Sequence, residues 1–136
     1  MRSARAVLTV TLAAGLATGL VACGASASAG DQVRAKVRQF ATATDARNVD
    51  VLCTQVLAPA LVARLTAAGL SCPQAMHLFV TSVSHPTISI SKVTVHGDSA
   101  SAVVLAGASG QTSALESIQL VRTKAGWRLA SLASPR

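Results

Sequence analysis

The side chains that could carry chemistry are few in this chain of 136 residues, and they form no recognisable catalytic set. The sequence contains no tyrosine. Glu116 shares the parity of Ile118 and Leu120 in a predicted strand, so it is the one acid that could face a pocket and act as a general base. We favour the alternative that it marks a strand edge near a loop. The other acids are predicted at helix starts, in a turn or on a polar helix face, and they are Asp31, Asp45, Asp50 and Asp98.

The three histidines lack the spacing of a metal site. His77 is predicted opposite the apolar stripe of a helix, His85 precedes a proline, and His96 belongs to a turn signal. No two of them are separated as in His-x-His or His-x-x-x-His, the short spacings at which zinc ligands often occur. We therefore predict no metal, no cofactor and no catalytic site, and we favour a protein that is not an enzyme.

Cys23 follows Leu20-Val21-Ala22 at the end of a leader in which Arg2 and Arg5 precede an uncharged stretch, 6–22. This motif resembles the lipobox of bacterial lipoproteins. The resemblance implies that 1–22 is a signal peptide, that Cys23 is lipidated, and that acyl chains such as palmitate hold the protein on the extracytoplasmic face of the cell membrane. Two or more acyl chains give stable anchoring where one does not. Two alternatives are a plain secretory signal, cleaved at small residues within 25–29, and a transmembrane anchor.

Cys53 and Cys72 remain as an even pair once Cys23 is modified. In an extracytoplasmic protein such a pair predicts a disulfide, because disulfides persist in oxidising compartments. Closing this loop of about twenty residues would contribute roughly 3 kcal/mol in the chain-entropy model. Two buried free thiols are the alternative, and a metal site is less favoured still because neither cysteine has a histidine or a second cysteine at ligand spacing.

Charge and composition limit the classes of partner that this protein is expected to bind. The chain carries 12 basic and 5 acidic residues, and removal of Arg2 and Arg5 leaves a net charge of +5. Nucleic-acid binding is not expected in this compartment, and few aromatic side chains could stack on bases. The basic residues after the leader either approach anionic lipid or form a solvated helix face; they are Arg34, Lys36 and Arg38. We predict a lipidated cysteine and flexible tether at 23–30 and one globular domain at 31–136.

Hydrophobic periodicity predicts three helices in the first half of that domain. The first is capped by Asp31 and runs to about Asn48. The second begins near Asp50 and is broken at Pro59, because proline lacks an amide proton and restricts the residue before it. The third opens at Ser71-Cys72-Pro73-Gln74, which has the spacing of a capping box.

From Thr87 onward the period changes to two, which predicts four antiparallel strands. The apolar pattern slips by one residue near Ser91-Lys92, as a β-bulge would produce. The strands are expected at about 87–95, 100–105, 115–122 and 127–132. The expected core is Val33, Val37, Phe40, Leu52, Leu61, Leu65, Phe79, Val80, Ile88, Val104, Leu120 and Leu129.

Helices followed by an antiparallel meander indicate an α+β fold, with three helices on a curved four-stranded sheet. The order of Asp50-Val51-Leu52-Cys53, Pro59, Cys72-Pro73 and Gly126-Trp127-Arg128-Leu129 resembles small actinobacterial lipoproteins of the nuclear-transport-factor-2-like (cystatin-like) superfamily. The resemblance spans about 31–132 and implies a cone-shaped domain that sometimes encloses a pocket. The expected function is non-enzymatic binding of an envelope protein, a cell-wall polymer or an apolar small molecule, or a structural envelope role. The alternative is a small isomerase- or cyclase-like pocket enzyme.

Overall fold

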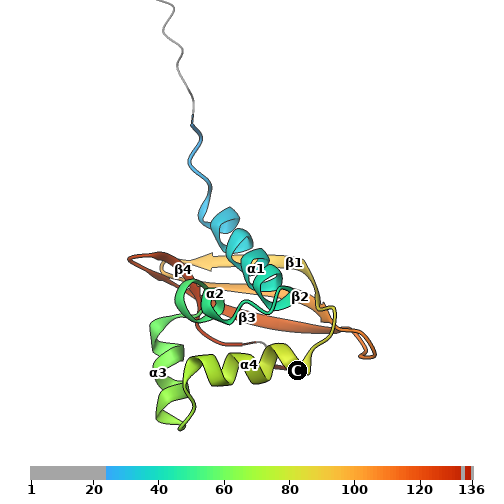
Figure 1. Ribbon diagram of the computed structural model, residues 1–136. Helices are drawn as coiled ribbons and strands as arrows, with labels where there is room; N and C mark the ends of the chain where they lie inside the picture. Colours follow the sequence, from blue (N-terminus) through green and yellow to red (C-terminus); the bar gives the residue numbers. More distant parts are fainter. Residues whose placement is uncertain (1–23, 133, 136) are drawn as a thin grey trace, which may run out of the picture.

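A computed structural model describes residues 24–132 and 134–135, which form an α+β domain with one antiparallel sheet. The leader and Cys23 lie outside the described residues. Helix α1 (Ala29–Asp45) lies across the sheet, and α3 (Pro59–Ala67) and α4 (Cys72–Ser82) form a corner beside it (Figure 1). Within the described part of the chain, no helix is both long enough and apolar enough to span a membrane.

Helix α1 begins earlier than the sequence pattern indicates. Ser28, not Asp31, is its N-cap, because the Ser28 hydroxyl oxygen accepts a hydrogen bond from the backbone amide of Asp31 at 3.1 Å. Asp31 lies in the first turn, where its negative charge interacts favourably with the positive end of the helix dipole. The exposed segment without regular structure is therefore 24–28, shorter than the tether we expected.

The second predicted helix is three separate pieces, so the domain has four α-helices where three were expected. Asn48 caps the short α2 (Val49–Val51), which continues into a π-helical turn, η1 (Leu52–Val56). The amide of Leu57 donates to the Leu52 carbonyl at 2.9 Å, five residues back. Pro59 then starts α3 at its first position, as the sequence predicts.

The sheet consists of β1 (Thr87–His96), β2 (Ser99–Gly107), β3 (Ala114–Thr123) and β4 (Gly126–Leu129) in that order. The predicted bulge is present, since the pairing of β1 with β2 shifts between Ile90 and Lys92. The expected four-stranded sheet gains a fifth strand, β5 (Ser134–Pro135), which pairs with β3. Strand β4 ends at Leu129, short of the expected 132.

The outer edge of β4 is covered by the segment that precedes α3. Leu57 pairs with Leu129 in a parallel bridge, and the Ala58 amide donates to the Leu129 carbonyl at 2.8 Å. This pairing satisfies backbone groups that an open sheet edge would leave to solvent.

Nine of the twelve predicted core residues are buried. The remaining three, Leu65, Phe79 and Ile88, are only partly buried and pack against the core. Phe79 and Ile88 are partly exposed because both line a cavity. The sequence pattern does not reveal this.

Candidate functional site

A cavity of about 290 Å³ lies between the helices and one end of the sheet. Its walls come from the end of α1, the end of α4, the start of β1, the end of β2, the loop after β2 and the start of β3. The apolar side chains that line it include Phe40, Phe79, Val83, Pro86, Ile88, Val104, Ala106, Ala114, Ile118 and Leu132.

Two aromatic rings form one wall of this cavity. Phe40 of α1 and Phe79 of α4 stack with their ring centroids 5.9 Å apart and their planes inclined by 21°. Such stacked pairs contribute about 0.5–1.5 kcal/mol beyond the area that they bury. The pair therefore fixes the two helix ends relative to each other and presents apolar surface to the cavity.

Glu116 points into the cavity, which is the orientation that the sequence analysis disfavoured. It pairs across the sheet with the fully buried Val104, so its side chain shares the inner face, and it is half-buried. Among the described residues that line the cavity, Glu116 is the only one with an acidic or basic side chain. Four uncharged polar side chains accompany it, and they are Thr44, Thr87, Gln111 and Thr112.

The three histidines do not meet Glu116 at the cavity. His77 is exposed on α4, His85 lies in the loop after α4 with a positive φ of 48°, and His96 is exposed at the end of β1. None of them lines the cavity, so the described residues bring no second titrating group to Glu116. Nor do the described residues bring three His, Cys, Asp or Glu side chains together where they could hold a metal ion.

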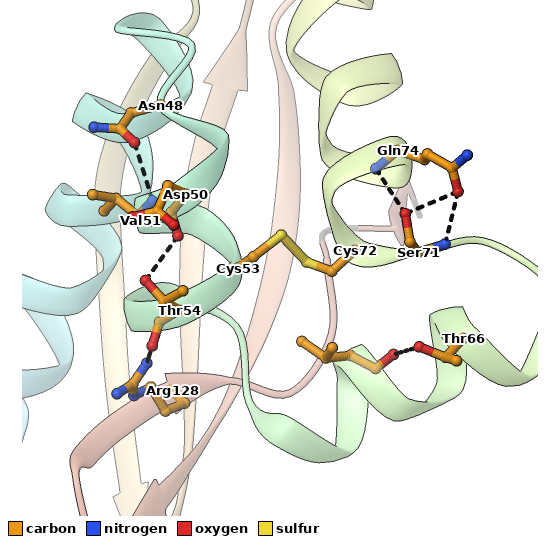
Figure 2. The surroundings of a disulfide bond; sticks show 11 residues. Asn48, Asp50, Val51, Cys53, Thr54, Thr66, Ser71, Cys72, Gln74 and Arg128 are labelled. Carbon is orange, nitrogen blue, oxygen red and sulfur yellow. Dashed lines mark hydrogen bonds between the residues drawn. A yellow bond between two sulfur atoms is a disulfide. The ribbon is translucent and has the colours of Figure 1, made fainter.

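The structure contains a disulfide between Cys53 in η1 and Cys72 at the start of α4, with their Cα atoms 5.9 Å apart (Figure 2). Hydrogen bonds fix the backbone on both sides of it. On one side, the Asn48 side-chain carbonyl accepts from the Val51 amide at 3.0 Å. On the other, Ser71 and Gln74 form the predicted capping box of α4.

Trp127 is a buried core residue. It is 2% exposed, and the guanidinium carbon of Arg122 lies 4.9 Å from its ring centroid. Arg122 also lies 3.8 Å from a carboxylate oxygen of Asp98. Arg122 therefore covers the Trp127 ring, and this ring offers no exposed apolar surface to a ligand.

The resemblance leaves open whether this domain encloses a pocket, and the sequence does not identify most of the residues that line it. The loop residues Gln111 and Thr112, and Val83 and Pro86 after α4, carry no pattern that distinguishes them from ordinary loop residues. The one available signal was the inward parity of Glu116 on β3.

Comparisons with known proteins support the fold. No protein-family model matches the sequence, and no curated protein matches it. The chain is similar in structure to a crystal structure from Streptomyces avermitilis, a member of the NTF2-like family that carries a provisional assignment as a dehydratase. The TM-score is 0.55 and the identity 18%, over 79% of this chain and 96% of that one. The domain thus has an NTF2-like fold, and a likeness at this identity extends to the fold alone.

Proposed function

We propose that this protein is a membrane-anchored, extracytoplasmic binding protein whose cavity takes an apolar small molecule. The observation that carries the proposal is the cavity of about 290 Å³, whose lining is mostly apolar and includes one carboxylate side chain. Ligand sites are typically concave and mostly apolar, with a few placed polar groups and volumes from about 300 Å³ upward. The cavity therefore suits a small ligand.

The polar groups of the cavity suggest how a ligand would be oriented. The Glu116 carboxylate accepts hydrogen bonds, so it would pair with a hydroxyl or amine on a ligand whose apolar part lies against Phe40 and Phe79. The Thr44 hydroxyl already donates to the Phe40 carbonyl at 2.8 Å, so its oxygen remains as an acceptor. Both groups therefore favour a ligand that donates hydrogen bonds.

A chemical test uses 2-naphthylmethanol and naphthalene as probes, with binding followed by NMR chemical shifts. We expect both to shift the amides of Ile88, Ala106 and Ile118, and the alcohol to bind more tightly because it can donate to Glu116. Ala106→Leu should block both, because its larger side chain fills the cavity. The matched control is Ala35→Leu at an exposed position of α1. Unchanged binding in Ala106→Leu would contradict the proposal.

One observation favours a second candidate, an isomerase- or cyclase-like enzyme. Glu116 is a carboxylate in a largely apolar cavity, which is the setting of a general base. The test is hydrogen–deuterium exchange beside the carbonyl of 2-tetralone, a probe ketone, in D₂O. Exchange that is accelerated by the protein and lost in Glu116→Gln would establish base chemistry. If Glu116→Gln changes only the affinity for 2-naphthylmethanol, the binding function stands alone.

The proposed anchoring rests on the lipobox that ends at Cys23, outside the described residues. The exposed segment 24–28 would span at most ~17 Å when extended, so the N-terminus of α1 would lie close to the membrane. Mass spectrometry of the membrane fraction should find an acylated N-terminal Cys23 peptide, and Cys23→Ser should release the protein. An unmodified mature N-terminus at Gly24 or beyond would contradict the proposal.

A further inference from the structure

A second hollow, which we call the groove, lies at the opposite end of the sheet from the cavity. It has a volume of about 410 Å³ and runs between the η1–α3 segment and the β3–β4 turn. Its walls are mostly apolar and include Leu57, Pro59, Val62 and Ala125. Arg128 of β4 is the only charged residue among those that line it.

One guanidinium nitrogen of Arg128 donates a hydrogen bond, and another has no hydrogen-bond partner within the described ranges. Its Nη1 donates to the Thr54 carbonyl at 2.7 Å, as Figure 2 shows. Its Nε is buried and has no hydrogen-bond partner among the described residues. A guanidinium has five N–H donors, and a buried donor without a partner is unfavourable. The side chain is therefore positioned, and its Nη2, which makes no hydrogen bond to the described residues and is not buried, remains as a donor for a further acceptor.

A second cation lies next to Arg128. The Lys36 ammonium donates to the Gln55 carbonyl at 2.9 Å and to the Gln39 side-chain oxygen at 2.7 Å. Arg128 and Lys36 thus bind consecutive carbonyls at the end of η1. Burial, and then the charge of Arg128, lower the pKa of Lys36. In the described part of the chain neither cation has a carboxylate within ion-pair distance, since the two ion pairs there involve Arg34 with Asp31 and Arg122 with Asp98.

Each cation caps one η1 carbonyl, but capping alone does not require that both donors be charged, because a neutral donor could bind either carbonyl. Two neighbouring positive charges repel each other, and partial burial strengthens that repulsion. A bound anion would relieve the repulsion and accept from the free donors of Arg128. The apolar walls of the groove would at the same time contact an apolar tail.

We propose that the groove binds an anionic amphiphile, a carboxylate or phosphate head on an apolar chain, with Arg128 pairing directly with the head and Lys36 adding charge beside it. A planar guanidinium can pair with either anion through two parallel hydrogen bonds. This site is separate from the cavity, because no residue lines both. It does not depend on the function proposed for the cavity.

The experiment compares four probes of one chain length, namely octanoate, octyl phosphate, octanol and octylammonium, with inorganic phosphate as a head without a tail. Binding is followed by ¹⁵N NMR through the Arg128 Nε–H signal and the amides of Val62 and Ala125. We expect octanoate or octyl phosphate to shift these signals together, octylammonium to leave them unchanged, and inorganic phosphate to bind more weakly than octyl phosphate. The stronger of the two anionic probes identifies the head group.

Variants separate recognition from folding. Arg128→Gln should weaken binding of the anionic probe about tenfold, in keeping with the strength of charge-assisted hydrogen bonds. Arg128→Lys should lose less, because it keeps the charge. Lys36→Gln should weaken binding by a smaller factor. The matched control is Arg64→Gln, since Arg64 also binds a backbone carbonyl, that of Ala130, but does not line the groove. Equal binding of octanoate and octylammonium, or equal losses in Arg128→Gln and Arg64→Gln, would overturn the proposal.

Discussion

The cavity and the groove lie at opposite ends of one sheet, and they differ in how their walls are held. The groove is bordered by the Cys53–Cys72 disulfide, by the pairing of Leu57 with Leu129 and by Arg128 bound to the Thr54 carbonyl. The strands under the cavity are joined by the β1–β2 and β2–β3 pairings, but the ends of α1 and α4 that cover it contact each other through the side-chain stack of Phe40 on Phe79. We infer that the helix ends over the cavity are held less firmly than the walls of the groove.

The largest expected effect is loss of the disulfide at the groove end. Replacing both Cys53 and Cys72 by serine frees a loop with a sequence separation of 19. In the chain-entropy model this lowers the free energy of unfolding by about 3 kcal/mol. Urea denaturation followed by Trp127 fluorescence measures the change. Amide hydrogen exchange in this double variant should become faster in η1 than at the cavity end of β2. An equal increase at both places would mean that the two ends do not differ in how they are held.

The two ends also differ in how far the sequence predicts them. The Ser71–Gln74 capping box, the Pro59 break and the bulge before Lys92 depend on residues close in sequence, and the structure contains all three. Arg128 and Thr54, by contrast, are 74 residues apart, and no local pattern couples them.

The cavity was harder to predict because it is defined by space that side chains leave unfilled. Phe79 and Ile88 carry the same apolar pattern as fully buried residues, so periodicity cannot tell a wall from a core. The inward face of Glu116 could be predicted from its parity, but the absence of a histidine beside it follows only from the tertiary structure. The π-helical turn at η1 was missed because its apolar pattern does not differ from that of an α-helix.

A matched pair of leucine truncations tests the contrast in packing. Leu52 is fully buried in η1, whereas Leu132 is partly buried and lines the cavity. Leu52→Ala should lower the free energy of unfolding by about 2–5 kcal/mol, as is usual for a buried leucine. Leu132→Ala should cost less than about 1 kcal/mol, because part of its surface is already outside the packed core. Equal losses in chemical denaturation would mean that the cavity wall is as tightly packed as the core.

A smaller effect is expected from the N-cap of α4. Ser71→Ala removes the hydroxyl oxygen that accepts from the Gln74 amide, and should cost about 1 kcal/mol. Measuring it with the disulfide present and with both cysteines replaced gives a double-mutant cycle. Because Ser71 adjoins Cys72, we expect a smaller loss without the disulfide, where the start of α4 is less firmly held. Additive losses would show that cap and disulfide act independently.

The smallest expected effect is a pH dependence that arises from Lys36. Burial, followed by the charge of Arg128, holds its pKa in the folded protein below the ordinary value of 10.5. Between the folded pKa and 10.5 the unfolded chain binds more protons at this site, so the free energy of unfolding should rise with pH across that window. Lys36→Gln should remove this contribution, and denaturation at several pH values measures it.

A second experiment separates burial from the charge of Arg128 as causes of the lowered pKa of Lys36. Direct NMR titration of the Lys36 side chain should give a pKa below 10.5 in the unaltered protein. Arg128→Gln removes the neighbouring charge, so the pKa of Lys36 should rise, yet it should stay below 10.5 because burial is the larger cause. A full return to 10.5 would mean that repulsion from Arg128 outweighs burial. An anion bound beside the two cations would then relieve a larger repulsion. The groove, with two neighbouring cations, would differ more strongly in electrostatics from the cavity, where Glu116 is the one charged side chain among the described lining residues.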